Sequence, residues 1–269
     1  MYKVVVSDID GTLVDQNQQI SEQNLKAIQQ FQNEGGIFTI ATGRVEQSVQ
    51  PLITQLQIKY PVILYNGGKV MDYQLKRVIY ERHISIQFAL GFVKMALNNK
   101  LNICIYTDKG IYILNETDTI RTYTAKDKVI VQLLPSVAFL TSHIVYKILI
   151  IDEEACFQTC YNYFEKVPMS DVTIIQSENT YLEILPANVS KGEALKVLMD
   201  YLNLPIQSAI AIGDHFNDIE MIKAAGVGVA VNNAIPTLKE YADAIVPSNI
   251  EHGVAKTIYK YCLQREWEI

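Results

Sequence analysis

The chain has 269 residues, of which 49% are hydrophobic and 19% charged, so it can bury a large core and is neither disordered nor fibrous. Its 29 acidic side chains outnumber the 23 basic ones, and the net charge of -6 argues against a nucleic-acid partner. No apolar run approaches the roughly 18 to 20 residues needed to span a bilayer. The sequence opens without a basic leader segment, so no membrane partner and a cytoplasmic location are expected.

Short apolar runs alternate with helical patterns in the first part of the chain. Ser21 is a candidate N-cap for a helix that a glycine pair ends. A later helical stretch contains Pro51, which must kink that helix or begin a new one. Strands are expected at residues 4–7, 37–41 and 61–65. This alternation is typical of βαβ units with a parallel sheet.

The pattern changes past residue 82. The turn Asp108-Lys109-Gly110 separates two β-branched runs and predicts a hairpin. In this region, strands are expected at residues 102–107, 111–114, 145–151, 172–176 and 181–185, and helices at 85–98 and 153–166. We therefore interpret residues 83–186 as an inserted α+β domain.

The alternating pattern resumes after Pro186. Helices are expected at 191–202 and before Ala225-Gly226, and strands at 209–212, 227–231 and 244–246. The outer domain is therefore expected to be discontinuous, comprising residues 1–82 and 187–269. Its predicted fold class is α/β, with a parallel sheet and helices on both faces.

Polar residues follow four of the expected strands. In parallel sheets, ligands bind outside the carboxyl ends of the strands, where loops carry polar groups on a rigid base. The four segments are Asp8-Ile9-Asp10-Gly11-Thr12, Thr42-Gly43-Arg44, Asn66-Gly67-Gly68 and Gly213-Asp214-His215-Phe216-Asn217-Asp218. Taken alone, Asp10-Gly11 fits an ordinary turn and Asp214 a helix N-cap. Four polar strand ends together favour a functional site.

Two pairs of carboxylates lie in these segments. Asp8 and Asp10 are two residues apart, so an extended backbone points both to the same side, where Asp214 and Asp218 can join them. Such a cluster repels itself unless a cation occupies it. Because the candidate ligands are oxygens, Mg²⁺ is favoured over zinc or copper.

The four cysteines are too few and scattered for a disulfide scaffold, and the helical pair Cys156 and Cys160 is interpreted as packing rather than a metal site.

Lys191 is the basic candidate for catalysis. The run Ser190-Lys191-Gly192-Glu193 fits a capping box and places the lysine in a first helical turn. A lysine there opposes the helix dipole, which favours pairing with a carboxylate or phosphate. A solvated surface position is the other interpretation, and the residues leave both open.

These segments resemble the motifs of the haloacid dehalogenase (HAD) superfamily of phosphohydrolases, most closely its Cof-type branch, subclass IIB with a C2 cap. The four motifs are matched in order by Asp8-Ile9-Asp10-Gly11-Thr12, Thr42-Gly43-Arg44, Lys191-Gly192 and Gly213-Asp214-His215-Phe216-Asn217-Asp218. The resemblance covers nearly the whole chain and implies a Rossmann-like HAD core plus an α+β cap that acts as a lid. Gly68 in place of alanine, and Asn232-Asn233-Ala234 in place of Gly-Asn-Ala, depart from the branch without touching the chemistry.

The resemblance implies a Mg²⁺-dependent phosphatase for small phosphate monoesters such as sugar phosphates, nucleotides or phosphorylated cofactors. Asp8 would be the nucleophile that forms an aspartyl-phosphate, and Asp10 the general acid and base. The metal would take the carboxylates of Asp8 and Asp214 and the main-chain oxygen of Asp10, while Asp218 would hold a metal-bound water. Phosphate or substrate contacts are implied for Thr42, Gly43, Arg44, Asn66, Lys191 and Asn217.

Two alternatives stay open, a phosphomutase on the same scaffold and a non-catalytic phosphate-binding or regulatory protein. The presence of both Asp8 and Asp10 argues against the second, because a binder needs neither a nucleophile nor an acid. His215 has no assigned role. The physiological substrate and the oligomeric state are not predicted. Tyrosines of the insert are interpreted as half-buried packing residues rather than a polyol or nucleotide site, namely Tyr106, Tyr112, Tyr123 and Tyr181.

Overall fold

The computed structural model describes residues 2–265, so residues 266–269 of the expected outer domain lie outside it. It contains two compact units. Unit 1 comprises the chain up to Glu81 together with the chain from Ser190, and unit 2 is Arg82–Val189. These boundaries differ from those expected after residues 82 and 186. Within the described part of the chain, no helix combines the length and apolar character needed to cross a membrane.

Unit 1 is built on a five-stranded sheet in the order β14-β13-β12-β1-β2, in which every pairing is parallel. The strands are β1 (Val4–Ser7), β2 (Ile37–Ile40), β12 (Ala209–Gly213), β13 (Val227–Val231) and β14 (Ala244–Val246). Every residue of β1, β2 and β12 is buried. Continuous burial of this kind requires a strand covered on both faces, which is why the sequence shows unbroken apolar runs.

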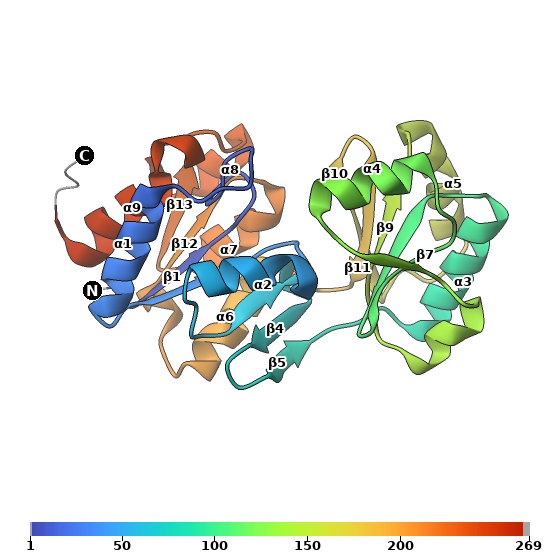
Figure 1. Ribbon diagram of the computed structural model, residues 1–269, viewed down its shortest axis with the longest axis horizontal. Coiled ribbons are helices and arrows are strands. Elements are labelled where there is room, and N and C mark those ends of the chain that lie inside the picture. Colours follow the sequence, from blue (N-terminus) through green and yellow to red (C-terminus); the bar gives the residue numbers. More distant parts are fainter. Residues whose placement is uncertain (1, 266–269) are drawn as a thin grey trace. The chain divides into compact units, whose positions relative to one another are not determined.

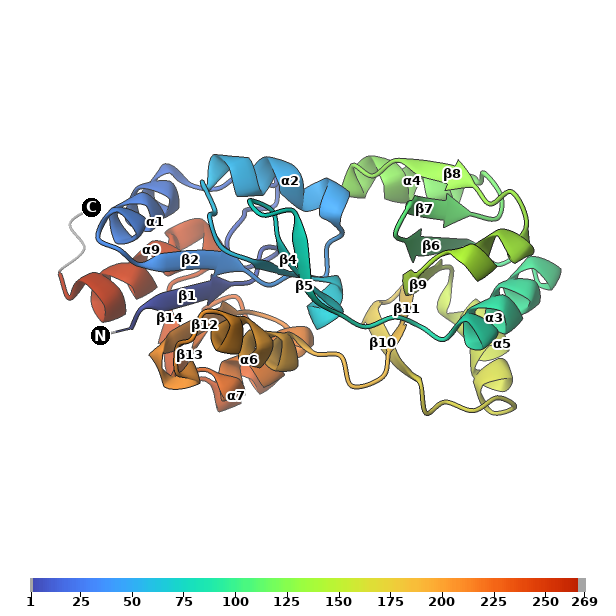
Figure 2. The ribbon, with the colours of Figure 1, turned by 90° about the horizontal axis from the view of Figure 1, so that it is seen from below.

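Helices cover both faces of this sheet. Figures 1 and 2 show α1 and α9 on one face and α6 and α7 on the other. The helices of unit 1 are α1 (Glu22–Asn33), α2 (Glu46–Gln55), α6 (Lys191–Tyr201), α7 (Ile219–Ala224), α8 (Pro236–Tyr241) and α9 (Gly253–Thr257). Short helical turns are η1 (Tyr65–Gly67), η3 (Ile206–Ser208), η4 (Phe216–Asp218), η5 (Asn249–Glu251) and the π-helical η6 (Ile258–Leu263). Ser21 caps α1 as expected, because its hydroxyl accepts from the Asn24 amide.

A second, antiparallel sheet in unit 1 was not predicted. Its order is β3 (Val62–Leu64), β4 (Lys69–Asp72) and β5 (Arg77–Glu81). β3 is the strand expected at 61–65, and a parallel bridge between Ala41 and Ile63 links it to the end of β2. Pro51 lies inside α2 and does not begin a new helix.

Unit 2 contains a six-stranded sheet in the order β10-β11-β9-β6-β7-β8, antiparallel except for β7 with β8. Its strands are β6 (Ile103–Thr107), β7 (Gly110–Ile113), β8 (Val131–Leu133), β9 (Val145–Ile151), β10 (Val172–Glu178) and β11 (Tyr181–Pro186). Its helices are α3 (Ile86–Asn98), α4 (Asp118–Asp127), α5 (Glu154–Phe164) and the turn η2 (Val137–Ser142). The sequence patterns predict the hairpin of β6 and β7 and the strands β10 and β11, but neither α4 nor β8.

The two faces of this sheet differ in character. Ile105 shares a hydrophobic core with Phe92 of α3 and Phe157 of α5. Successive strand residues point to opposite faces, and Tyr106 accordingly contacts Tyr123 of α4 through their hydroxyl groups. Tyr106 and Tyr123 are buried, as the packing interpretation requires.

The cysteines are free thiols, and Cys160 belongs to the apolar core.

Candidate active site

The polar segments after β1, β2 and β12 meet at one edge of the parallel sheet. The Asp8 amide donates to the Ile212 carbonyl at 2.9 Å, and the Ala41 amide donates to the Ser7 carbonyl at 2.9 Å. These bonds continue the strand register past the last residue of β1. The carboxyl ends of neighbouring parallel strands therefore carry Asp8, Thr42 and Asp214 to the same edge.

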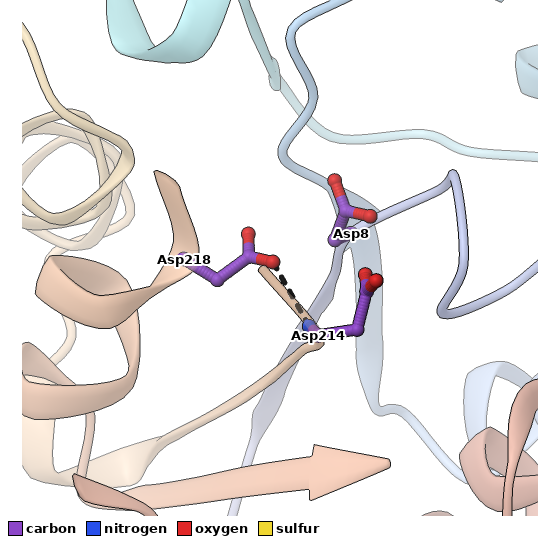
Figure 3. Close-up of side chains that lie close together, drawn as sticks. All are labelled: Asp8, Asp214 and Asp218. Atoms are coloured by element: carbon purple, nitrogen blue, oxygen red, sulfur yellow. Dashed lines mark hydrogen bonds between the residues drawn. The ribbon is translucent and has the colours of Figure 1, made fainter. Parts of the chain in front are cut away.

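Three carboxylates gather there. Asp8, Asp214 and Asp218 each offer an oxygen, and these oxygens lie within 4.8 Å of one another. Figure 3 shows the three side chains converging from β1 and from the segment that follows β12. Asp8 is 5% exposed and Asp218 is fully buried. Three of the four carboxylates expected to converge therefore meet here, whereas Asp10, expected to point to the same side as Asp8, is not part of the cluster.

Lys191 lies inside this cluster. Its ammonium nitrogen is 2.5 Å from Asp8 Oδ1 and 2.6 Å from Asp218 Oδ1, and the whole side chain is buried. The lysine begins α6, whose N-cap Ser190 accepts a hydrogen bond from the Glu193 amide at 3.1 Å. The interpretation of Lys191 as a carboxylate partner is therefore correct, and the solvated surface position is wrong.

Asp218 is held on both oxygens. Oδ1 accepts from Lys191, and Oδ2 accepts from the backbone amides of Asp214 and His215 at 3.0 and 3.1 Å. Asp214 is held differently, by the Thr12 hydroxyl, which donates to its Oδ1 at 2.8 Å. The loop after β12 is thus folded around the Asp218 carboxylate, while Asp214 keeps its other oxygen, Oδ2, beside Gly11.

The cluster carries more negative charge than the lysine balances. Burial raises the pKa of Asp8, and the nearby carboxylates of Asp218 and Asp214 oppose the lowering effect of Lys191. Burial, then the charge of Asp218, raises the pKa of Asp214 from 3.8 to about 6. A low-dielectric environment disfavours ionised carboxylates unless a positive charge compensates them.

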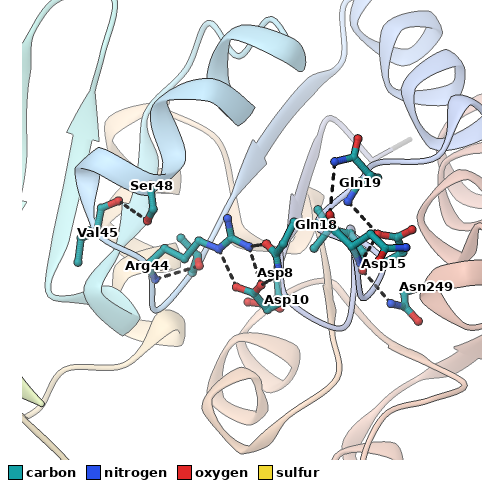
Figure 4. Close-up of polar contacts among 12 residues, drawn as sticks. Asp8, Asp10, Asp15, Gln18, Gln19, Arg44, Val45, Ser48 and Asn249 are labelled. Carbon is teal, nitrogen blue, oxygen red and sulfur yellow. Dashed lines mark hydrogen bonds and ion pairs between the residues drawn. The ribbon is translucent and has the colours of Figure 1, made fainter. Parts of the chain in front are cut away.

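Asp10 turns away from this cluster and pairs with Arg44, as Figure 4 shows. The guanidinium donates from Nε to Oδ2 at 2.8 Å and from Nη2 to Oδ1 at 2.6 Å. Gln18 also donates to Oδ1, at 3.2 Å, and its carbonyl accepts from Arg44. Partial burial raises the pKa of Asp10, but the hydrogen bond and charge of Arg44 outweigh it and lower the pKa. The Asp10 carboxyl is therefore held ionised at the edge of the site.

The remaining candidate residues form a second contact group. The Thr42 hydroxyl accepts from the Arg44 amide at 3.0 Å. Asn217 donates from Nδ2 to Asn66 Oδ1 at 2.9 Å, and a Cβ on Gly43 would lie 2.8 Å from that same oxygen. The loops after β2, β3 and β12 are thus joined through Asn66.

Three residues that shape the site were not predicted from the sequence. Thr12 hydrogen-bonds Asp214, Gln18 bridges Asp10 and Arg44, and Gly11 allows Asp214 to approach the backbone closely. Thr12 and Gly11 stand in the same polar segment as Asp8 and Asp10, and that position was the available signal. Gln18 lies in the loop between β1 and α1, and its contacts depend on the course of that loop, which the sequence does not reveal.

Comparisons with known proteins agree with this architecture. A family model described as haloacid dehalogenase-like hydrolase matches residues 5–258. Phosphatase YwpJ of Bacillus subtilis is 30% identical over 94% of this chain and 97% of its own length. The 5-amino-6-(5-phospho-D-ribitylamino)uracil phosphatase YcsE of the same organism is 29% identical, covering 97% and 96%.

Solved structures show the same likeness in three dimensions. A haloacid dehalogenase-like hydrolase from Bacteroides thetaiotaomicron superposes with a TM-score of 0.86 at 30% identity, covering 97% of this chain and 99% of its own. A protein from Thermotoga maritima superposes with a TM-score of 0.89 at 28% identity, covering 97% of each chain. The expected α/β fold class is therefore confirmed.

The family match begins in β1 and ends in η6, so it takes in both segments of unit 1 and all of unit 2. Relatives that share nearly their full length with this chain are named phosphatases, which confirms the expectation of a phosphatase at this coarse level. We conclude that the chain belongs to the haloacid dehalogenase-like hydrolases.

Proposed function

We propose that the chain is a Mg²⁺-dependent phosphatase that hydrolyses small phosphate monoesters through an aspartyl-phosphate on Asp8. The observation that carries this proposal is the buried ammonium of Lys191, 2.5 Å from Asp8 in a cluster of three carboxylates. A phosphate dianion is repelled by an anionic nucleophile, so catalysis depends on fixed positive charge and on alignment. Lys191 supplies such a charge beside the attacking oxygen.

A divalent cation fits the donor set of this cluster. Its candidate ligands are carboxylate oxygens, which Mg²⁺ prefers, and three carboxylates gather around the single ammonium of Lys191, so the cluster carries excess negative charge. Asp8, Asp214 and the main-chain oxygen of Asp10 would hold the ion, which supplies positive charge toward the phosphoryl oxygens when bound. Both oxygens of Asp218 are already engaged, which supports an indirect role for that residue.

The proposed reaction divides the work between two carboxylates. Asp8 attacks phosphorus, and the bond from phosphorus to the leaving oxygen breaks as that oxygen takes a proton from Asp10, which acts as an acid only after it parts from Arg44 and takes up a proton from water. Asp10 then takes a proton from the water that attacks the aspartyl-phosphate, which releases inorganic phosphate and restores Asp8. Asp10 can exchange this proton with water because its side chain is 51% exposed and lies outside the carboxylate cluster.

Hydrogen-bond donors for the phosphoryl oxygens are proposed on the loop after β2. The Thr42 hydroxyl accepts from the Arg44 amide, which leaves its own hydrogen for a phosphoryl oxygen. The Gly43 backbone amide and the Asn217 side chain are the other proposed donors. Donors fixed in this way stabilise charge that develops in the transition state.

The proposed substrates are sugar phosphates, nucleotides and phosphorylated cofactors. The name of the relative YcsE specifies a phosphorylated ribityl group joined to a uracil ring, which belongs to this class of small monoesters. A panel of such esters assayed with Mg²⁺ for release of inorganic phosphate tests the class. Isomer formation without phosphate release would indicate a phosphomutase, and binding without turnover would indicate a regulatory protein.

The nucleophile is tested by substitution. Asp8→Asn is expected to abolish hydrolysis of p-nitrophenyl phosphate while the circular dichroism spectrum stays unchanged, because an amide cannot form the acyl phosphate. Asp200→Asn, at an exposed acidic position of α6, is the matched control and should retain full activity. An active Asp8→Asn variant, or activity that survives exhaustive chelation, would contradict the proposal.

A further inference from the structure

The turn η1 has an unusual backbone. Tyr65, Asn66 and Gly67 have φ angles of 53°, 56° and 99°, so three successive residues occupy the left-handed region. That region is uncommon for residues other than glycine, and it is an outlier for a bulky side chain such as tyrosine. Strained backbone of this kind persists only where the surrounding structure holds it, and it clusters at functional sites.

Backbone hydrogen bonds attach this turn to the loop after β2. The Tyr65 amide donates to the Arg44 carbonyl at 3.2 Å, and the Asn66 amide donates to the Thr42 carbonyl at 3.0 Å. In return, the Thr42 amide donates to the Ile63 carbonyl at 2.9 Å. The loop that carries the proposed phosphate donors therefore accepts backbone hydrogen bonds from η1 and donates one to β3.

The Asn66 side chain extends the attachment to the loop after β12. It is 6% exposed, and its Oδ1 accepts from Asn217 Nδ2 at 2.9 Å. A Cβ on Gly43 would lie 2.8 Å from the same oxygen, so the carboxamide also packs directly on the Gly43 backbone. One amide group thus fixes the spacing between two loops that come from separate strands.

Gly67 brings the turn against the start of α6. A Cβ there would lie 2.1 Å from the Ser190 carbonyl oxygen and 3.0 Å from the Lys191 amide nitrogen. Both atoms belong to the backbone and cannot swing aside as a flexible side chain can. The position of the N-terminus of α6, and with it Lys191, therefore depends on the absence of a side chain at residue 67.

We propose that η1 is a positioning element for the active site, and that Asn66 is a positioning residue that acts through Asn217 and the Gly43 backbone rather than a phosphate ligand. The proposal rests on the proposed phosphatase function. It replaces the direct substrate contact that the family resemblance implies for Asn66. Thr42, Asn217 and Lys191 would all lose alignment if the turn were disturbed.

Asn66→Gly tests the side chain without adding backbone strain, because glycine adopts a left-handed φ freely. Asn203→Gly is the matched control, since Asn203 is exposed and also left-handed, with φ of 53°. Asn66→Gly is expected to lower kcat for p-nitrophenyl phosphate by about tenfold or more with little change in KM, and Asn203→Gly to change neither. An Asn66→Gly enzyme with the kcat of the wild type would overturn the proposal.

A double-mutant cycle separates positioning from direct contact. If Asn66 acts through Asn217, then adding Asn66→Gly to Asn217→Ala should lower kcat by no more than about threefold beyond the single variant. Effects that multiply in full would show that Asn66 does not act through Asn217, and the proposal would be wrong.

Hydrogen exchange gives a readout that needs no turnover. Peptides covering residues 42–44 and 213–218 should exchange faster in Asn66→Gly than in the wild type or Asn203→Gly, because the link between their loops is lost. Unchanged exchange would contradict the positioning role. A chain that hydrolyses no ester of the panel would refute the phosphatase function, while the exchange result would still decide whether η1 joins these loops.

Discussion

Lys191 and Asp8 stand 183 residues apart in the sequence, yet their Nζ and Oδ1 atoms are 2.5 Å apart in a buried ion pair. Burial alone would lower the pKa of the lysine, but the carboxylates of Asp218 and Asp8 raise it above its usual range. The ammonium is therefore charged at neutral pH. Removing the lysine would leave the buried carboxylates of Asp8 and Asp218 without their counter-charge.

Lys191→Met keeps most of the side-chain volume and removes the charge. We expect the free energy of unfolding to fall by about 3–5 kcal/mol, because Asp8 and Asp218 lose their buried counter-charge. Hydrolysis should slow by a factor of about 100 to 1000, the scale of a lost electrostatic clamp. Urea unfolding and steady-state kinetics measure the two effects.

The control for this variant is Lys196→Met, on the same helix. Lys196 is 53% exposed and pairs with Glu193 at 2.6 Å. Exposed pairs of this kind contribute little, so its stability should stay within about 0.5 kcal/mol of the wild type. Equal free energies of unfolding in the two variants would show that the buried ion pair contributes no more to stability than the exposed one.

Asp214→Asn should stabilise the protein in the presence of a chelator at neutral pH. The pKa of Asp214 in the folded chain is about 6, above the ordinary 3.8, because of burial and then the charge of Asp218. A raised pKa favours folding while the group is protonated, and this contribution is lost as the pH rises through about 6. The variant should therefore gain about 1–3 kcal/mol at pH values above about 7, and little at about pH 4.

Thermal unfolding at both pH values with chelator, then with Mg²⁺, provides the measurement. Added Mg²⁺ should raise the Tm of the wild type, because the ion binds only the folded cluster, and should raise that of Asp214→Asn much less. A stability gain over the wild type that grows as the pH falls, or a variant that responds to Mg²⁺ as the wild type does, would refute the account of this carboxylate.

The convergence of carboxylates was predictable because it follows from sheet geometry. β1 and β12 are continuous apolar runs, their residues pair in parallel register, and Asp8 and Asp214 come directly after the aligned ends. Parallel strands place their carboxyl ends at one edge whatever the loops between them do. Side-chain contacts do not follow in this way. Lys191 in a first helical turn is equally compatible with solvent until the packing of α6 is known.

The missed elements have weak local signals. β5 pairs at the edge of its sheet and exposes Arg77 and Val78, so its sequence shows no clear apolar alternation. The contact between Asn66 and Asn217 depends on a left-handed turn that nothing in the residues Tyr65-Asn66 demands. Non-local packing holds such backbone in place, so it is visible only in the folded chain.

Unit 2 contains its own buried ion pair. Lys147 Nζ lies 2.9 Å from Glu183 Oε2, with side chains 7% and 9% exposed, and stacks over the ring of Tyr106. Lys147→Met should lower the free energy of unfolding by about 3–5 kcal/mol, because Glu183 would lose its counter-charge. The double variant Lys147→Met with Glu183→Leu should recover most of this loss, to within about 1–2 kcal/mol of the wild type.

Urea unfolding followed by circular dichroism distinguishes these outcomes. Lys109→Met is the control. The Lys109 side chain is 62% exposed and forms a long ion pair of 3.5 Å with Asp108. Because exposed ion pairs contribute little, this variant should change stability by less than about 1 kcal/mol. A double variant as unstable as Lys147→Met would mean that the lysine stabilises the sheet by packing rather than by charge.

Gly11→Ala separates backbone strain from a clash with the proposed metal ligand. Gly11 has φ of 80°, and a Cβ there would lie 2.4 Å from Asp214 Oδ2. Gly35 has φ of 87° with nothing within 4 Å of such a Cβ. Both alanine variants should be destabilised by about 1 kcal/mol, because alanine is strained at positive φ. Only Gly11→Ala must displace the Asp214 carboxylate.

Titration calorimetry with Mg²⁺ tests this difference. We expect Gly11→Ala to weaken Mg²⁺ binding by about tenfold or more, since a displaced ligand forfeits at least about 1.4 kcal/mol of binding free energy. Gly35→Ala should bind Mg²⁺ as the wild type does, because its substitution meets open space. Wild-type affinity in both variants would place the metal away from Asp214. Equal weakening would attribute the effect to backbone strain alone, and either result would exclude Gly11 as the residue that makes room for this ligand.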